Sequence, residues 1–251
     1  MDFALQISQE YGKGYLSYSS IKYALQDMRL FEMKMRDQLK VDSPALSFGK
    51  LYDCLLLTPE DFSKHYFVAD DRIVLENIGG KAPKRTKAYA EWKAKMEEGG
   101  LTLVSGEDVK KAEEMILRLK VTGVYEEHLK GDTQYEFNDF IGEVPVRGFL
   151  DVLGDGFIVD SKTTQKLDKF KWAVRDFGYD IQAYIYTSVL GISDFRWVAQ
   201  EKAYPFAIGV YTASEDTIKS GEKRFNTAVQ RIKEFLDSGL PHDEYYETGV
   251  I

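Results

Sequence analysis

The stretch from Arg147 to Thr164 constrains the fold of this chain more than any other segment. Two short apolar runs lie in it, one ending at Leu153 and the next beginning at Phe157, with Gly154-Asp155-Gly156 between them. A turn of this composition between two apolar runs is typical of a tight β-hairpin. The sequence therefore predicts that the two runs are neighbouring antiparallel strands.

Charged residues stand on both strands of this predicted hairpin. Asp160 and Lys162 are two positions apart, so their side chains share one face of the second strand. If the hairpin pairs, Asp151 of the first strand lies beside that face. Two carboxylates offer the oxygen ligands that Mg²⁺ prefers, and a lysine can orient a bound water. The pattern predicts a metal-and-water site; a surface hairpin with scattered charges is the alternative, because one Asp-x-Lys triplet is common by chance.

A later helix adds polar side chains that could face the hairpin. Tyr179, Gln182 and Tyr186 follow one another at separations of three and four, which places them on one helical face. Such a stripe beside two carboxylates could hold a substrate backbone or a water. The alternative is an amphipathic helix whose tyrosines border the core.

Helical and strand-like segments are interleaved along the chain, which predicts an α/β or α+β fold. The 251 residues, 44% of them hydrophobic, suffice for one substantial core with a helical annex. We predict a single domain over 1–251, with a mostly helical part at 1–130 and a sheet-containing core at 131–240. The expected helices are 15–40, 47–57, 105–121, 168–190 and 214–236, and the expected strands are 135–140, 144–153, 156–162, 195–201 and 206–211.

A basic and aromatic strip lies in the middle of the chain. Lys84, Arg85 and Lys87 precede Trp92, with further lysines around them. Cations interleaved with aromatic rings could follow a phosphate backbone and stack on an end base. A solvated helix face explains the same composition equally well.

Charge and cysteine content exclude several classes of protein. The formal net charge of −8 counts against a protein that coats nucleic acid by bulk charge. A single cysteine, Cys54, excludes a disulfide framework within the chain and a four-cysteine metal site. No secretory signal is evident, and no apolar run approaches the ~20 residues of a membrane span. We therefore expect a cytoplasmic protein without a membrane partner.

Taken together, motifs spread over most of the chain resemble the PD-(D/E)xK nuclease superfamily, in particular its phage and prophage branch similar to exonuclease VIII (RecE-like). The core motifs are Gly148-Phe-Leu-Asp151 and Ile158-Val-Asp160-Ser-Lys162, preceded by Glu136. The helix with Gln182 and Tyr186 resembles the Gln-x-x-x-Tyr helix of that branch. Further matching elements are the helix that begins at Phe48-Gly49, the segment Arg85-Thr-Lys87-Ala, and the late strand Val198-Ala-Gln-Glu201-Lys202.

This resemblance implies a restriction-endonuclease-like core, with a central mixed sheet flanked by helices. It implies a Mg²⁺-dependent exonuclease that degrades linear double-stranded DNA, in the 5′→3′ direction, within a bacterial host cell. It also implies a homo-oligomeric ring that threads DNA and a single-strand annealing protein as the partner in recombination. A ring would retain DNA by topology where a net-acidic chain cannot retain it by charge.

The resemblance also assigns roles to individual residues. Asp151 and Asp160 would bind one or two Mg²⁺ ions, for which Mn²⁺ would substitute, helped by the Ser161 carbonyl and by Glu136. Lys162 would position or activate the attacking water, and Gln182 and Tyr186 would brace the scissile region. Related nucleases often have a histidine ligand on the early helix, where this chain has Asp53. That aspartate either binds the metal too or has dropped out of catalysis.

Three alternatives remain open at the level of sequence. The same fold could be a single-strand exonuclease or a structure-selective endonuclease. The chain could be a DNA-binding module with a dead site, although the intact Asp151, Asp160 and Lys162 argue against that. A glycoside hydrolase with two carboxylates is the third, and it would need neither Lys162 nor a metal.

Overall fold

The computed structural model describes residues 2–41, 43–79 and 85–238, and it divides into two compact units. The first unit contains residues 1–41 and 130–251, and the second contains residues 42–129. The N-terminal helices therefore share a unit with the strands, whereas the sequence grouped residues 1–130 together. Sequence order alone cannot show that a chain returns to its first helices. The prediction of a single domain stays a prediction.

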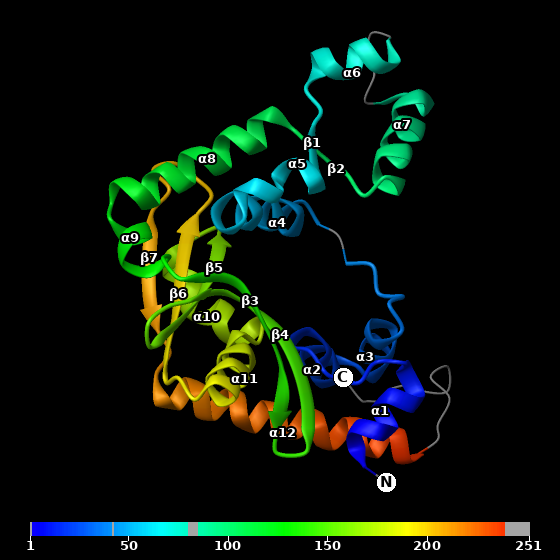
Figure 1. The fold of residues 1–251 in the computed structure, drawn as a ribbon, viewed down its shortest axis with the longest axis vertical. Helices are drawn as coiled ribbons and strands as arrows, with labels where there is room; N and C mark the ends of the chain where they lie inside the picture. The colour runs from blue at the N-terminus through cyan, green and yellow to red at the C-terminus, as the bar shows by residue number, and fades with distance from the viewer. Residues whose placement is uncertain (1, 42, 80–84, 239–251) are drawn as a thin grey trace, which may run out of the picture. The chain divides into compact units, whose positions relative to one another are not determined.

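Five strands form a mixed sheet in the first unit (Figure 1). They are β3 (Asp132–Ile141), β4 (Val144–Leu153), β5 (Phe157–Thr164), β6 (Asp194–Glu201) and β7 (Ile208–Thr212), in that spatial order. β5 and β6 are parallel, and the other neighbours are antiparallel. Parallel neighbours need a crossover, which here consists of η3 (Leu167–Lys169), α10 (Phe170–Asp176) and α11 (Tyr179–Leu190). The predicted fold, a central mixed sheet flanked by helices, is confirmed.

Helices from both ends of the chain complete this unit. They are α1 (Phe3–Tyr11), α2 (Tyr18–Gln26), α3 (Met28–Met35) and α12 (Glu215–Ser238). α11 packs on the sheet, and α12 packs against α11 and α2 (Figure 1). Ile181 and Ile185 of α11 are buried in a core that includes Ile21, Leu150 and Phe225.

Two helices predicted as continuous are divided in the structure. The segment 15–40 breaks at Asp27, which has an extended backbone and whose carboxylate accepts the Arg29 N–H at 2.8 Å. The segment 168–190 breaks at Gly178, whose φ of 77° is readily adopted by glycine. An aspartate cap and a left-handed glycine both end helices that apolar spacing alone would continue.

The second unit is mostly helical. Its elements are α4 (Pro44–Leu57), η1 (Pro59–Asp61), α5 (Phe62–His65), β1 (Tyr66–Val68), α6 (Asp71–Ile78), α7 (Lys87–Glu98), β2 (Thr102–Val104), α8 (Gly106–Val121) and α9 (Val124–His128). α4 packs against α8, and β1 pairs in parallel with β2. The predicted helix over 105–121 is present as α8, and Ser105 caps its start by accepting the Asp108 N–H at 3.1 Å. None of the described helices in either unit is long and apolar enough to cross a membrane.

A buried ion pair fixes the start of α11 to α12. Asp180 is 2% exposed and accepts hydrogen bonds from Arg224 Nη1 at 2.7 Å and from Ser220 Oγ at 2.9 Å. The two helices are also close, because a Cβ on Gly221 would stand 2.1 Å from the Asp180 carbonyl oxygen. This contact sets the position of α11, the helix that carries Gln182.

We predict that Arg224→Ala lowers the free energy of unfolding by about 3 kcal/mol, because the Asp180 carboxylate stays buried without its counter-charge. Urea unfolding followed by circular dichroism measures the loss. Lys219→Ala is the control: its exposed pair with Glu215 spans 3.4 Å, and such pairs contribute less than about 1 kcal/mol. Equal stabilities of the two variants would contradict the role of the ion pair.

Candidate active site

The predicted hairpin is present, and its strands separate at the charged residues. The ladder between β4 and β5 joins Val152 to Val159 and Leu153 to Ile158, next to the turn. The next pair in this register would be Asp151 opposite Asp160, and like charges directly opposite each other disfavour pairing. The Asp151 Oδ2 instead accepts the backbone N–H of Ser161 at 2.8 Å. The strands thus form a fork, and both carboxylates lie where it opens.

Burial in the fork changes how Asp151 ionises. Its Oδ1 accepts a long hydrogen bond of 3.4 Å from Gln134 Nε2. Loss of solvation, followed by the negative charge of Asp160, raises the pKa of Asp151 to about 6. Burial also raises the pKa of Asp160, although Lys162 opposes this. Both carboxylates therefore favour an added positive charge.

Lys162 supplies one positive charge directly. Its Nζ lies 2.5 Å from Asp160 Oδ2 and 3.3 Å from the Ser161 carbonyl oxygen, and it stands 5.0 Å from the centre of the Tyr179 ring. Burial alone would lower the pKa of Lys162, but Asp160 and Asp151 outweigh that effect and raise it. The side chain is therefore a fixed ammonium ion in the metal-free protein rather than a base.

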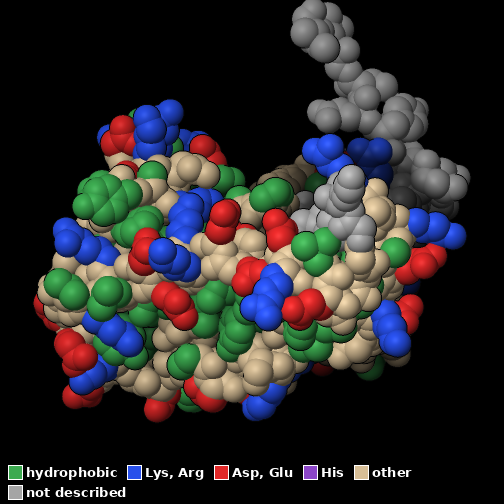
Figure 2. Space-filling view, turned by 90° about the horizontal axis from the view of Figure 1, so that it is seen from above, with side chains coloured by type: hydrophobic (Ala, Val, Ile, Leu, Met, Phe, Trp, Pro, Cys, Tyr) green, Lys and Arg blue, Asp and Glu red, His purple; other side chains and the backbone are tan. Residues whose placement is uncertain are grey.

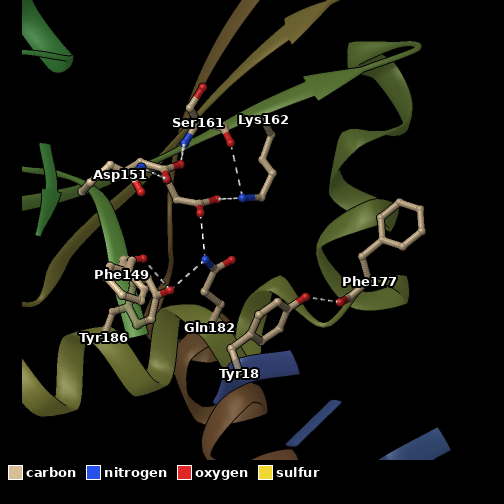
Figure 3. A network of polar contacts seen from close by, with 10 residues as sticks. Tyr18, Phe149, Asp151, Ser161, Lys162, Phe177, Gln182 and Tyr186 are labelled. Carbon is tan, nitrogen blue, oxygen red and sulfur yellow. Dashed lines mark hydrogen bonds and ion pairs between the residues drawn. The ribbon is translucent and has the colours of Figure 1, made fainter. Parts of the chain in front are cut away.

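A second layer from α11 holds the fork (Figure 3). Gln182 Nε2 donates to Asp160 Oδ1 at 2.8 Å and to Tyr186 Oη at 3.2 Å. Tyr186 Oη in turn donates to the Phe149 carbonyl oxygen at 2.9 Å, so α11 is tied to both strands. Gly148 makes room for this contact, because a Cβ there would stand 3.1 Å from the Tyr186 ring. The structure thus brings together Asp151, Asp160, Ser161, Lys162, Gln182 and Tyr186.

The oxygen atoms in the fork fit a hard divalent cation. Asp160 Oδ2 is buried, and its partner within the described chain is the Lys162 ammonium, 2.5 Å away. With Asp151 and the Ser161 carbonyl it forms the all-oxygen donor set that such ions prefer. Across the described residues, no three His, Cys, Asp or Glu side chains gather into a metal site. Two carboxylates suit Mg²⁺, which keeps several waters when bound.

The chain matches the model of a known protein family. The model of a PDDEXK-like domain of unknown function (DUF3799) matches residues 17–241. The chain belongs to this family. The match covers the fork and α11, and it confirms the resemblance to PD-(D/E)xK nucleases. Such nucleases generally use divalent metal ions.

A solved structure shows the same fold. A crystal structure from Eubacterium rectale, named "Putative exonuclease", aligns over 98% of this chain and 93% of its own, with a TM-score of 0.65 and 16% identity. A phage related exonuclease from Haemophilus somnus 129PT aligns over 70% of this chain and 98% of its own, with a TM-score of 0.36 and 14% identity. No curated protein matches the chain.

Two further residues predicted as metal ligands, Glu136 and Asp53, are not part of the fork. Glu136 on β3 accepts a hydrogen bond from Arg147 Nε at 2.6 Å, and the same guanidinium donates to Tyr15 Oη. Asp53 lies on α4 of the second unit. Neither residue joins a described group of three possible ligands, so their roles as ligands stay predictions.

The predicted DNA-binding strip belongs to the second unit. Lys84 lies outside the described residues, and Arg85 and Lys87 are exposed. Lys87 Nζ lies 3.4 Å from Glu91 on the same helix, and the half-buried Trp92 ring stands 6.1 Å from that of Phe67. The role of this strip in DNA binding stays a prediction. Basic and acidic side chains are interspersed on the face shown in Figure 2.

Tyr18 is a site residue to which the sequence assigned no role, whereas Tyr179 belongs to the predicted helical stripe. Tyr18 Oη donates to the Phe177 carbonyl oxygen at 2.5 Å, beside the start of α11 (Figure 3). Burial raises the pKa of Tyr18 despite the nearby charge of Lys162. Tyr179 shares a helical face with Gln182, which is a signal that spacing provides. Tyr18 has none, because only the tertiary fold brings α2 to the fork.

A cavity adjoins this second layer. It has a volume of about 440 Å³ and reaches from Tyr186 and Phe149 to the loop before α2. Its lining combines cations, hydroxyl groups and aromatic rings, including Lys13, Ser17 and Tyr18. The lining also includes Asp37, which pairs with Lys13 at 2.7 Å.

The pKa of Asp151 predicts how the metal-free protein responds to pH. The folded-state pKa, about 6, lies above the usual 3.8, so the folded state binds the proton more tightly. The contribution of Asp151 to the free energy of unfolding is then fully present below pH 3.8 and is lost as pH rises through 6. Each unit of pKa shift accounts for at most about 1.4 kcal/mol of this loss. Melting temperatures in EDTA between pH 4 and 7.5 measure the slope. Asp151→Asn should flatten it, and an equal slope in the variant would contradict the assignment.

The basic strip generates a separate prediction. If Arg85 and Lys87 contact phosphate, the double variant Arg85→Ala/Lys87→Ala binds duplex DNA several-fold more weakly. The slope of log K against log salt then shrinks by roughly 0.9 for each phosphate that the variant fails to neutralise. Fluorescence anisotropy between 50 and 200 mM salt measures both, with Lys219→Ala/Lys223→Ala as a charge-matched control. An unchanged slope would assign the strip to a solvated helix face.

Proposed function

We propose that this protein is a Mg²⁺-dependent exodeoxyribonuclease that degrades linear double-stranded DNA from its ends. The observation that carries the proposal is the fork, in which Asp151, Asp160 and Lys162 converge at the end of a hairpin. A glycoside hydrolase with two carboxylates has no use for the ion pair of 2.5 Å between Lys162 and Asp160. Membership of the PDDEXK-like family supports phosphodiester hydrolysis over that alternative.

The residues of the fork divide the chemistry among them. Asp151, Asp160 and the Ser161 carbonyl would hold the divalent ion, which would polarise the phosphate and lower the pKa of a bound water. Lys162, kept as an ammonium ion, would orient the attacking water and offset the charge that develops on the phosphate oxygens. Lys162 contacts Oδ2 of Asp160, and Gln182 donates to Oδ1. The two contacts together keep the carboxylate from rotating.

The cavity beside Tyr186 supports a preference for DNA ends. Its volume of about 440 Å³ suits a single unpaired nucleotide better than a continuous duplex. A free strand end could enter it while the next phosphate lies at the fork. The 5′→3′ polarity, the ring-shaped oligomer, the cytoplasmic setting and the annealing protein as partner rest on the resemblance to the exonuclease VIII branch.

The test is digestion of a linear blunt duplex labelled at either the 5′ or the 3′ end. We expect loss of the 5′ label first, in Mg²⁺ or Mn²⁺ and not in EDTA. We expect Lys162→Ala to bind DNA normally yet cut at least about 100-fold more slowly, because removing a charge aimed at the transition state costs this much in other enzymes. Lys223→Ala, an exposed lysine on α12, should cut at the normal rate.

Other results would redirect the assignment. Nicking of a closed circle would indicate an endonuclease, and degradation of single strands alone would indicate a single-strand exonuclease. Full activity of Lys162→Ala would remove the proposed role of that residue. No cleavage with either metal would leave a DNA-binding module.

A further inference from the structure

The segment after the catalytic strand has one buried anchor. Beyond Lys162, β5 ends at Thr164, and η3 and α10 lead the chain to α11. Phe170 is 2% exposed and stacks on the Tyr211 ring, with 5.1 Å between ring centres. The core therefore holds this segment in place at Phe170, and other large side chains of the segment can face solvent.

Two large aromatic rings on this segment are exposed. Trp172 is 62% exposed and Phe177 is 54% exposed. Single exposed apolar residues are common on protein surfaces. Here two exposed aromatic rings lie on one short segment, ten and fifteen residues after Lys162. Exposed rings of this kind can stack on the bases of a nucleic acid.

Cations flank these rings along the chain, and the Lys171 ammonium stands 5.1 Å from the centre of the Trp172 ring. Lys166, Lys169, Lys171 and Arg175 are all exposed, against two acidic residues, Asp168 and Asp176. Within the described chain no ion pair joins any of the four cations to a carboxylate. Trp172 and Arg175 are three apart on α10 and so are neighbours on its surface, and Lys169 precedes the helix at the end of η3. This net-positive strip contrasts with the overall charge of −8.

The segment is in physical contact with the fork. The Lys162 ammonium lies over the Tyr179 ring, and the centres of the Tyr179 and Phe177 rings are 5.8 Å apart. Tyr18 Oη holds the Phe177 backbone in place, and the Phe177 ring points away from the carboxylates (Figure 3). An aromatic path thus runs from the catalytic cation to the surface.

We infer that this surface, made of Lys166, Lys169, Lys171, Trp172, Arg175 and Phe177, binds a single-stranded stretch of the DNA substrate. The inference rests on the proposed function. Bases stack on Trp172 and Phe177, and the four cations neutralise the phosphates between them. The occupant is an unpaired strand, because the bases inside a duplex present no free ring face to an exposed aromatic side chain. The surface then holds unpaired nucleotides beside the fork, where the strand is cut.

The test measures binding without cleavage. The intact protein in EDTA is titrated into a fluorescent 12-nucleotide oligothymidine, and anisotropy gives the Kd. We expect Trp172→Ala to raise the Kd about tenfold or more, since each stacked base contributes on this scale. Trp172→Phe should restore binding, because the ring face remains. Lys169→Ala/Lys171→Ala should reduce the salt slope by roughly 0.7 for each phosphate that the variant leaves without a cation.

Phe140→Ala is the matched control, because Phe140 is 59% exposed on the same unit and far along the chain from this segment. Equal affinities of Trp172→Ala and Phe140→Ala would overturn the inference. So would an equal loss of blunt-duplex and single-strand binding, which would assign the surface to duplex DNA. A lower oligomer mass for Trp172→Ala in light scattering, with DNA affinity unchanged, would refute the inference and make the surface a contact between copies of the chain.

This experiment is independent of catalysis. If the protein cuts no DNA in Mg²⁺ but Trp172→Ala still loses single-strand binding, the proposed nuclease function fails and the surface stands. If it cuts DNA normally and Trp172→Ala binds as the unchanged protein does, the function stands and the surface is refuted.

Discussion

The site depends on a conflict between two carboxylates. Asp151 and Asp160 occupy positions that a continued β4–β5 ladder would place opposite each other, and the strands separate there instead. The separation costs backbone pairing, part of which the Asp151 carboxylate replaces by accepting the Ser161 N–H. It also leaves two negative charges in a poorly solvated fork with one ammonium ion. An excess of buried negative charge stabilises a bound cation, so the feature that weakens the sheet would also favour the divalent ion that we propose.

The helix α11, which packs on the sheet, holds the fork in this geometry. Gln182 and Tyr186 tie α11 to β5 and β4, and Asp180 ties the same helix to Arg224 of α12. Contacts thus connect the Asp160 carboxylate to α11, and α11 to α12. Catalytic groups must be held to a fraction of an ångström to act in a transition state, and rigid elements achieve this better than loops do.

The first unit contains the fork, the cavity beside Tyr186 and the exposed aromatic surface. These features come from segments far apart in the chain: the loop before α2, the β4–β5 fork, and the crossover from β5 to β6. The crossover has two tasks, because it makes β6 parallel to β5 and also presents Trp172 and Phe177 on the segment that contacts the fork. The second unit contains Asp53 and the described part of the basic strip, whose roles in binding metal and DNA stay predictions.

The sequence by itself determined the hairpin, its turn and the residues of the fork, because alternation along a strand and spacing along a helix are local properties that one stretch of chain fully specifies. For the same reason it placed Gln182, Tyr186 and the buried isoleucines on their proper faces. It missed the breaks at Asp27 and Gly178, where capping and backbone conformation override apolar spacing. Only the tertiary structure brought Tyr18 to the site, paired Glu136 with Arg147 by a hydrogen bond, and placed the first 41 residues in the same unit as the sheet. Those contacts link residues distant in sequence, and no local pattern encodes which distant partner a side chain will meet.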